Sequence, residues 1–187
     1  MATSSQSTPL STKMPTFQLR DVRTGEDVAS DMLDGSALVV IFMCNHCPYV
    51  KRIAEGLASL GHDVAGSDVD VVGISANDAD TYPEDSPENL ARASDEVGYP
   101  FPILYDDTQE VARAFGAVCT PDIFVFDHER KLTYRGQFDG ARPSNDVPVT
   151  GDDLRAAVEA TLAGEEITDQ IASIGCGIKW KPGNEPG

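Results

Sequence analysis

The sequence predicts an α/β fold built on a central mixed β-sheet. Three apolar segments rich in β-branched or aromatic residues, 37–43, 69–75 and 123–127, have the composition of strands buried on both faces. Between the first two, residues 48–61 repeat apolar side chains with helical spacing, which predicts a βαβ unit with two parallel strands. The third segment and residues 131–135 flank a polar turn and predict an antiparallel hairpin, so the sheet is expected to be mixed.

Local signals predict the remaining elements. Ser86 followed by Pro87 is a typical helix start and Gly98 a typical stop, which together indicate a helix over 86–97. Thr150 and Asp153 suggest a capping box at the start of a later helix. The other expected elements are a strand at 16–22, a short helix at 108–115, and a helix at 152–163 with Leu154, Ala157, Val158 and Leu162 on its inner face and Gly164 as its stop.

A length of 187 residues predicts one domain with a core of its own. Residues 1–14 are rich in Ser and Thr with almost nothing to bury, and we expect a mobile arm there. The domain is expected to span residues 15–163, and residues 164–187 a C-terminal tail that packs on it through Ile174, Ile178 and Trp180.

The charge balance is strongly acidic. Lys and Arg total 14 against 31 Asp and Glu, giving a net charge of −17, and Asp occurs 20 times against 5 Lys. Nucleic acid and anionic membranes are excluded as main partners, because binding them depends on basic residues that displace counterions. The dispersed short acidic side chains favour a halophile-type surface over that of an ordinary acidic protein.

Neither a leader-like N-terminus nor a long apolar run is evident. Residues 1–15 lack an apolar stretch behind a basic one, and no apolar run approaches 18 residues. Four cysteines are too few for a secreted disulfide framework. We therefore expect a cytoplasmic protein whose thiols serve chemistry.

The motif that carries this chemistry is Cys44-Asn45-His46-Cys47, between the first buried strand and its helix. Two thiols at this spacing lie about one helical turn apart, close enough to alternate between dithiol and disulfide. We expect Cys44 at the helix N-terminus, where free N–H groups stabilise a thiolate and lower its pKa below the free value of about 8.5. Cys44 would then attack first, and Cys47, one turn inside and more shielded, would resolve the mixed disulfide.

His46 and the metal alternative bear on the same motif. A protonated His46 would stabilise the Cys44 thiolate and make the disulfide more oxidising, whereas the alternative is a solvated loop histidine without effect on the redox potential.

The main alternative to redox chemistry is half of a tetrathiolate zinc site, which needs a second cysteine pair. Because Cys119 and Cys176 are single and widely separated, we expect no metal and no cofactor.

A second motif, Val118-Cys119-Thr120-Pro121, precedes the 123–127 strand. A proline cannot donate to a sheet ladder, so Pro121 marks an unusual strand entrance at which a cis bond is expected. Here the sequence resembles the thioredoxin fold, a three-layer fold with a central mixed sheet flanked by helices. The resemblance implies that Pro121 faces the cysteine pair and that the backbone of Thr120 docks the substrate chain.

The resemblance extends from residue 15 to about 163. Residues 120–136 are similar to the Thr-Pro, strand, Asp turn, strand hairpin of peroxiredoxin-like and TlpA-like redoxins. The chain is most similar to peroxiredoxin-like proteins, of the alkyl hydroperoxide reductase and thiol-specific antioxidant type, that carry CxxC in place of the peroxidatic site. An N-terminal strand extension and a C-terminal tail complete the expected thioredoxin-like fold.

One departure from true peroxiredoxins is specific. The peroxiredoxins that this chain resembles carry the pattern Pro-x-x-x-Thr-x-x-Cys, whose Cys aligns with Cys47. At the positions of the Pro and the Thr, this chain has Val40 and Cys44. We therefore expect a thiol–disulfide oxidoreductase, with a thiol peroxidase or a non-catalytic redox switch as alternatives. Its expected partners are protein or small-molecule disulfides and thiols, with a thioredoxin reductase-type electron donor.

Two further thiols are candidates for an auxiliary role. Cys119 lies two residues before Pro121 and is either close to the active site or a small buried residue beside the sheet. Cys176, flanked by Gly175 and Gly177, is sterically accessible and is a candidate resolving or regulatory thiol.

The acidic composition generates a prediction about salt. If the surface is of the halophile type, the melting temperature should keep rising up to molar KCl, where the Debye length is only about 3 Å and charge repulsion is screened. Thermal unfolding followed by circular dichroism at increasing KCl tests this, and a melting temperature that does not change with salt would refute it.

Overall fold

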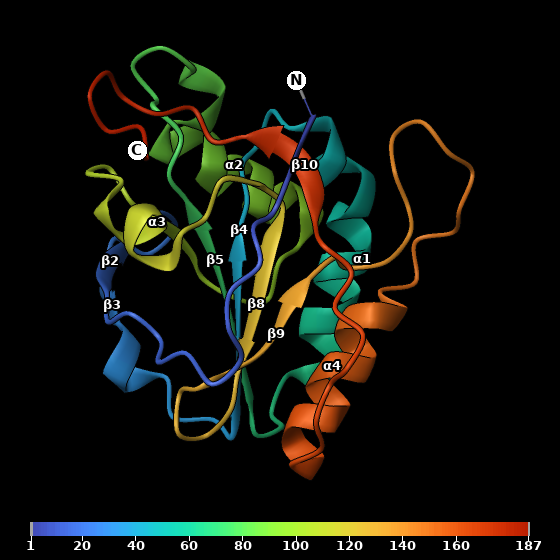
Figure 1. Cartoon of the computed structure of the whole chain (residues 1–187). Helices are drawn as coiled ribbons and strands as arrows, with labels where there is room; N and C mark the ends of the chain where they lie inside the picture. Colours follow the sequence, from blue (N-terminus) through green and yellow to red (C-terminus); the bar gives the residue numbers. More distant parts are fainter. Residues whose placement is uncertain (1, 187) are drawn as a thin grey trace.

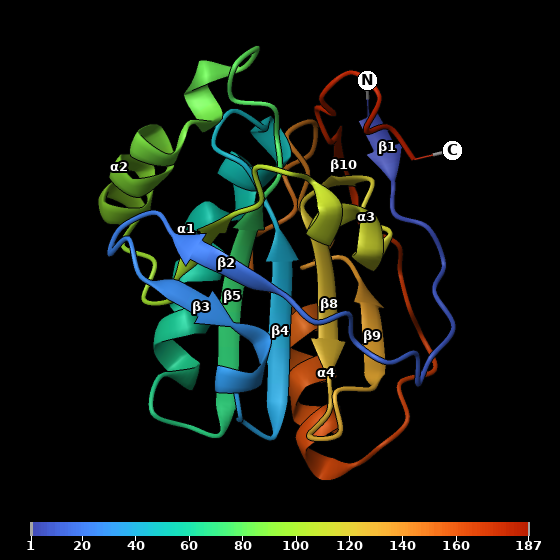
Figure 2. The same ribbon diagram turned by 90° about the vertical axis from the view of Figure 1, so that its left-hand side faces the viewer.

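A seven-stranded mixed sheet forms the central layer of the computed structural model, which describes residues 2–186 (Figures 1 and 2). The strands β4, β5 and β6 are parallel, and the others run antiparallel to their neighbours. The predicted α/β class and mixed sheet are confirmed. In sheet order the strands are β3 (Asp27–Ala29), β2 (Gln18–Asp21), β6 (Ile103–Tyr105), β5 (Val69–Ser75), β4 (Ala37–Phe42), β8 (Asp122–Phe126) and β9 (Leu132–Gly136).

Helices cover both faces of this sheet, which gives the three layers (Figure 2). One face is covered by α1 (Pro48–Val64) and α4 (Asp152–Ala163), with α2 (Pro87–Val97) packed beside α1. The other face is covered by α3 (Glu110–Phe115) and by the segment around Met14 and Phe17. Two short 3-10 helices, η1 (Ser30–Met32) and η2 (Pro83–Asp85), lie in connecting segments.

The central strand β4 shows why its sequence is apolar throughout. Alternate side chains of a strand point to opposite faces, and every residue of β4 is fully buried. Val39 and Ile41 belong to the core under α1 and α4, whereas Leu38, Val40 and Phe42 belong to the core on the other face. In that second core, Phe115 packs edge-on against aromatic rings from β4 and β8.

The helix signals in the sequence are largely confirmed. Pro48 is the first residue of α1, whose predicted end at Gly61 is extended to Val64. The hydroxyl of Ser86 accepts a hydrogen bond from the N–H of Asn89, and Gly98 ends α2 with a φ of 79°. The apolar side chains predicted for the inner face of α1 are all buried: Val50, Ile53, Leu57 and Leu60.

The start of α4 differs from the prediction. Gly151, with a φ of 71°, is the N-cap residue, and neither Thr150 nor Asp153 forms the predicted capping box. Instead the carboxylate of Asp139 accepts the N–H groups of Thr150 and Gly151, both at 2.8 Å. Leu162, predicted on the inner face, is 46% exposed, because its neighbour Thr161 takes the inner position in the last turn and bonds to Thr133 of β9 at 2.8 Å.

The two ends of the chain meet in a second, small sheet. The strand β1 (Ala2–Ser4) pairs with β10 (Ile174–Gly177), which pairs with β7 (Cys119–Thr120), all antiparallel. The mobile arm predicted for residues 1–14 is therefore wrong from residue 2 onward, and Met1 lies outside the described residues. The prediction failed because this strand is held by backbone hydrogen bonds, which do not require apolar side chains.

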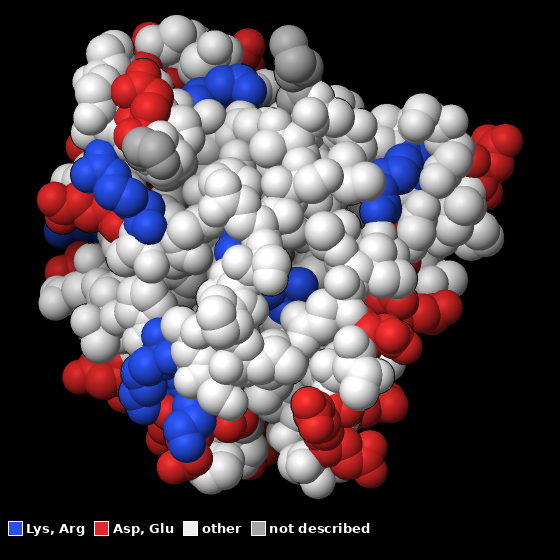
Figure 3. Space-filling view, viewed as in Figure 1, with Lys and Arg blue, Asp and Glu red and all other residues white. Residues whose placement is uncertain are grey.

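The surface over this small sheet differs from the rim of the molecule. In Figure 3, acidic side chains gather at the edges of the visible face, while the region over β1 and β10 shows few charged atoms.

Within residues 2–186, no helix combines the length and the apolar character needed to cross a bilayer.

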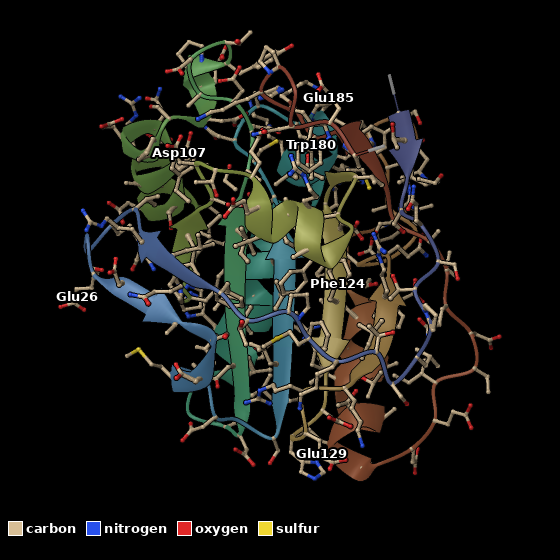
Figure 4. All side chains as sticks on the ribbon, turned by 60° about the vertical axis from the view of Figure 1, so that its left-hand side comes forward. Glu26, Asp107, Phe124, Glu129, Trp180 and Glu185 are labelled. Carbon is tan, nitrogen blue, oxygen red and sulfur yellow. The ribbon has the colours of Figure 1, made fainter. Side chains whose placement is uncertain are left out.

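The C-terminal tail lies along the domain. After β10, Ile178 is buried and Trp180 is half-buried against the core that contains Phe124 (Figure 4). Lys181 forms an ion pair with Asp107 at 2.6 Å. The tail therefore covers the end of the sheet to which the CxxC loop belongs; Gly187 lies outside the described residues.

A buried ion pair on the hairpin gives a stability prediction. Arg135 on β9 contacts Asp122 on β8 at 2.7 Å, with side chains only 3% and 0% exposed. In Asp122→Ala the guanidinium stays charged without its carboxylate, so the free energy of unfolding should fall by about 3–5 kcal/mol.

The matched control is the exposed pair Arg20–Asp27, whose side chains are 71% and 51% exposed. Asp27→Ala should cost less than about 1 kcal/mol. Urea unfolding under reducing conditions measures both variants, and equal losses would contradict the argument.

Candidate active site

The CxxC loop connects β4 to α1, and its two cysteines occupy different positions from those predicted. Cys47 is the N-cap residue of α1, with extended backbone angles, and Pro48 is the first helical residue. Cys44 lies three residues earlier, in the loop, and both are buried, at 2% and 0% exposure. The expectation of an exposed Cys44 at the helix N-terminus with Cys47 one turn inside is therefore wrong by one turn.

Both sulfur atoms face Thr120. The Sγ of Cys44 lies 3.3 Å from the Thr120 hydroxyl, and the Sγ of Cys47 lies 3.1 Å from the Thr120 carbonyl oxygen. The Thr120–Pro121 bond is cis, as predicted. Each thiol also shifts the pKa of the other. The loop and the strand entrance therefore bring both thiols to one residue, Thr120, an arrangement suited to forming a disulfide.

The pair shares one proton unequally. The hydrogen bond from Cys44 lowers the pKa of Cys47 to about 4 in spite of burial, and the N–H of Val50 in the first turn of α1 acts in the same direction. The same hydrogen bond, burial and the negative charge of Asp85 raise the pKa of Cys44. The N-terminus of α1 therefore favours negative charge on Cys47 and Asp85 disfavours it on Cys44, whereas in its neutral form the Cys47 thiol donates to the Thr120 carbonyl. Which of the two sulfurs attacks first stays a prediction.

A buried carboxylate fixes the loop between the cysteines. Asp85, at the end of η2, is fully buried. One of its oxygens accepts the N–H groups of Asn45 and His46 at 2.7 and 3.2 Å. The other accepts the side chain of Asn77 at 2.8 Å and lies 2.5 Å from the Nδ1 atom of His46. Sequence reasoning missed Asp85, because a contact across forty residues leaves no local pattern.

His46 is held against Asp85 near Cys44, and its predicted effect on the redox properties of the pair stays a prediction. Its ring contacts Asp85 and stacks on Tyr82 at 5.5 Å between centroids. The ligand atoms of Cys44, His46 and Asp85 lie within 4.8 Å of one another, so these three residues could hold a metal ion. The oxygens of Asp85 already have hydrogen-bond partners, however, and the arrangement is satisfied as a clamp on the loop.

Of the two auxiliary thiols, the structure brings Cys176 to the pair. Cys176 on β10 lies opposite Thr120 in the antiparallel register and packs against the core that contains Cys44 and Cys47. Burial and the neighbouring Cys47 raise the pKa of Cys176 to about 11. Cys119 is a small buried residue beside the sheet: its Sγ contacts the carbonyl of Pro121 at 3.7 Å, and burial raises its pKa.

The edge of Thr120 is not open. The resemblance implied that its backbone docks the substrate chain, but β10 already pairs with β7 along this edge. The segment that sequence analysis treated as a tail is thus part of the wall of the active site.

A small cavity reaches Cys44 from the side of α2. It has a volume of about 50 Å³ and a mostly apolar lining that includes Val50, Leu90 and Tyr99. The hydroxyl of Ser94 on its wall is buried and has no hydrogen-bond partner among residues 2–186. A molecule of a few heavy atoms fits there, whereas a polypeptide does not.

The three layers, the cis-Pro loop and the paired thiols define a thioredoxin-fold redoxin. More specifically, the chain belongs to the AhpC/TSA family, whose model matches residues 10–135. The predicted resemblance to peroxiredoxin-like redoxins is confirmed. No curated protein matches the chain.

Solved structures extend the comparison. An uncharacterized conserved protein from Geobacillus kaustophilus is 48% identical, with a TM-score of 0.95 over 97% of each chain. A hypothetical protein from Sinorhizobium meliloti is 47% identical, with a TM-score of 0.94 over 97% of this chain and 100% of the other. The thioredoxin domain of a thiol-disulfide oxidoreductase from Bacteroides vulgatus is 19% identical, with a TM-score of 0.65 over 83% of this chain and 99% of that domain. At that identity the last match shows the fold alone.

The location of the thiolate can be tested by titration. In the reduced protein, ultraviolet thiolate absorbance should be present at neutral pH and disappear only as the pH falls through about 4, the pKa of Cys47. A lowered pKa keeps the charged form at all higher pH values, so the signal should not change between pH 6 and 8.

Three variants assign the signal. Cys47→Ser should remove the thiolate absorbance at neutral pH, whereas Cys119→Ser, which changes a buried thiol outside the pair, should leave it unchanged. In Cys44→Ser the signal should persist, because a serine hydroxyl still donates to Cys47. A signal lost in Cys44→Ser and retained in Cys47→Ser would return the thiolate to Cys44.

Proposed function

We propose that this redoxin is a thiol–disulfide oxidoreductase in which Cys44 and Cys47 alternate between dithiol and disulfide. The observation that carries the proposal is the pair itself: two buried sulfurs that both contact Thr120, one of them on the N-cap residue of α1 with its pKa lowered to about 4. A thiolate is the nucleophile in disulfide exchange, and a neighbouring thiol is needed to release the product.

The shared proton suggests how one cycle proceeds. The Cys47 thiolate attacks one sulfur of a disulfide, a new S–S bond forms, and the other sulfur leaves as a thiolate. Cys44 then attacks the sulfur of Cys47, and the second product leaves. The proton that Cys44 loses in this step neutralises a departing thiolate, so proton and electrons balance within the pair and the substrate.

Each neighbouring residue has a part in this cycle. The hydroxyl of Thr120, 3.3 Å from Cys44, can stabilise the negative charge that develops on that sulfur. Asp85 keeps the loop in the conformation that holds the sulfurs together, and its charge keeps the proton on Cys44. We expect thiols and disulfides as partners, with a thioredoxin reductase-type protein as electron donor.

Peroxide reduction is the second candidate, and the cavity at Cys44 favours it. Its volume of about 50 Å³ suits a small oxidant. The low pKa of Cys47 suits attack on a peroxide, which would give a sulfenic acid that Cys44 condenses with to form the same disulfide. Against it, the hydroxyl of the family pattern is replaced by the thiol of Cys44.

Insulin reduction with dithiothreitol tests the function. The wild type should accelerate precipitation of the insulin chains, and Cys47→Ser should abolish this acceleration because the nucleophile is lost. Cys44→Ser should retain the first attack and stall in an oxidised form that dithiothreitol reverses, visible by mass spectrometry on Cys47. Cys119→Ser is the matched control and should turn over like the wild type.

The outcomes separate the candidates. Rapid consumption of hydrogen peroxide without insulin turnover would favour the peroxidase, and a reversible disulfide with neither activity would identify a redox switch. Stalled adducts on Cys44 in Cys47→Ser would reverse the proposed order of attack.

A further inference from the structure

A third thiol, Cys176, lies beside the buried pair and nearer to solvent. Cys44 and Cys47 are buried, whereas Cys176 is half-buried, lies opposite Thr120, the residue that Cys47 contacts, and packs against the core that contains the pair. We propose that Cys176 is the residue through which the pair exchanges disulfides with partner proteins, so that the catalytic unit has three thiols. This proposal rests on the oxidoreductase function proposed above.

Burial makes such a relay necessary for a protein partner. Exchange requires the attacking and the attacked sulfurs to approach to bonding distance, about 2.05 Å in the product. The path to Cys47 is covered by β10 and Thr120, and the cavity at Cys44 admits only small molecules. Of the three clustered thiols, Cys176 is the one that a sulfur on another polypeptide can reach.

The fold holds Cys176 in this position firmly. The strand β10 lies between β1 and β7, and Cys176 is opposite Ala2 on one side and Thr120 on the other. Beside it, a Cβ atom added to Gly175 would lie 1.9 Å from the carbonyl oxygen of Thr120, so only glycine permits this approach. The strand therefore places a thiol against Cys47 where a partner strand would otherwise bind.

The relay consists of thiol–disulfide exchanges that balance. From the oxidised pair, the Cys176 thiolate attacks the sulfur of Cys47; the Cys47–Cys176 bond forms, and the Cys44–Cys47 bond breaks with protonation of Cys44. A partner thiolate then attacks the sulfur of Cys176, and Cys47 leaves as a thiolate. A second partner thiol attacks the mixed disulfide and releases Cys176. The partner is oxidised by two electrons, the pair is reduced by two, and reduction of a partner disulfide runs through the same bonds in reverse.

The electrostatics of the cluster favour the nucleophile of the first step, Cys176, and the leaving group of the second, Cys47. Cys47, with its pKa lowered to about 4, is a good leaving group. After burial, the effects that raise the pKa of Cys176 are the hydrogen bond with Cys47 and its negative charge. Both vanish when Cys47 enters a disulfide, so oxidation of the pair makes the Cys176 thiolate more available.

The surface around Cys176 suits a protein partner. The region over β1 and β10 shows no acidic side chains in Figure 3, and the ammonium of Lys179 lies 2.8 Å from the carbonyl of Gly177 at the end of β10, although the chain carries a net charge of −17. A partner that approaches here avoids the repulsion that the acidic rim exerts on other acidic proteins.

Trapping the intermediate tests the proposal directly. Cys44→Ser, oxidised with diamide and then alkylated, should yield a Cys47–Cys176 disulfide in peptide mass spectra. Gly175→Ala in the same background keeps Cys47 and Cys176 but pushes β10 away from Thr120, and should abolish this disulfide. If Cys47 and Cys176 remain unlinked in Cys44→Ser, or pair with Cys119 instead, the relay is overturned.

Turnover separates this proposal from the proposed function. Cys176→Ser should retain the thiolate absorbance of Cys47 and the Cys44–Cys47 disulfide formed by diamide, but reduce insulin at least about tenfold more slowly, since exchange depends on access to the attacked sulfur. Cys119→Ser should match the wild type. Equal insulin reduction by the wild type and Cys176→Ser overturns the relay alone, whereas a wild type that does not reduce insulin overturns the proposed function and this proposal with it.

Discussion

The buried carboxylate of Asp85 is the group on which the arrangement of the active site depends. It binds the backbone of the CxxC loop at Asn45 and His46 and reaches Asn77 at the end of β5. Its charge also raises the pKa of Cys44 and so disfavours a thiolate on that sulfur. One residue thus sets both the shape of the loop and the direction in which the proton is shared.

The layered fold could be predicted where a local pattern was strong. The bounds of β5 and α4 agree with the sequence analysis, because a run of β-branched residues and a helix that stops at a glycine, Gly164, are local properties. The start of α1 lies at Cys47 and not at Cys44 as predicted, because sequence patterns place a helix end only to within a few residues. The contacts of Asp85 and the β1–β10–β7 sheet join segments far apart in the chain, and no local pattern reports them.

The strand β10, which covers the cysteine pair, lies outside the part of the chain that matches the family model. In the matched region, residues 10–135, the chain shares the AhpC/TSA framework. Cys176, on this strand, also lies beyond that region. The relatives from Geobacillus kaustophilus and Sinorhizobium meliloti are similar over 97% of this chain, so the similarity extends past the family framework.

The position of Trp180 has a practical consequence. It is the single tryptophan of the chain, and it packs half-buried against the aromatic core a few residues after Cys176. Its emission therefore depends on how closely the segment that follows β10 is packed. A movement of β10 during a redox cycle would alter this fluorescence, and the molecule thus carries an intrinsic optical reporter of its own active-site strand, readable without a label.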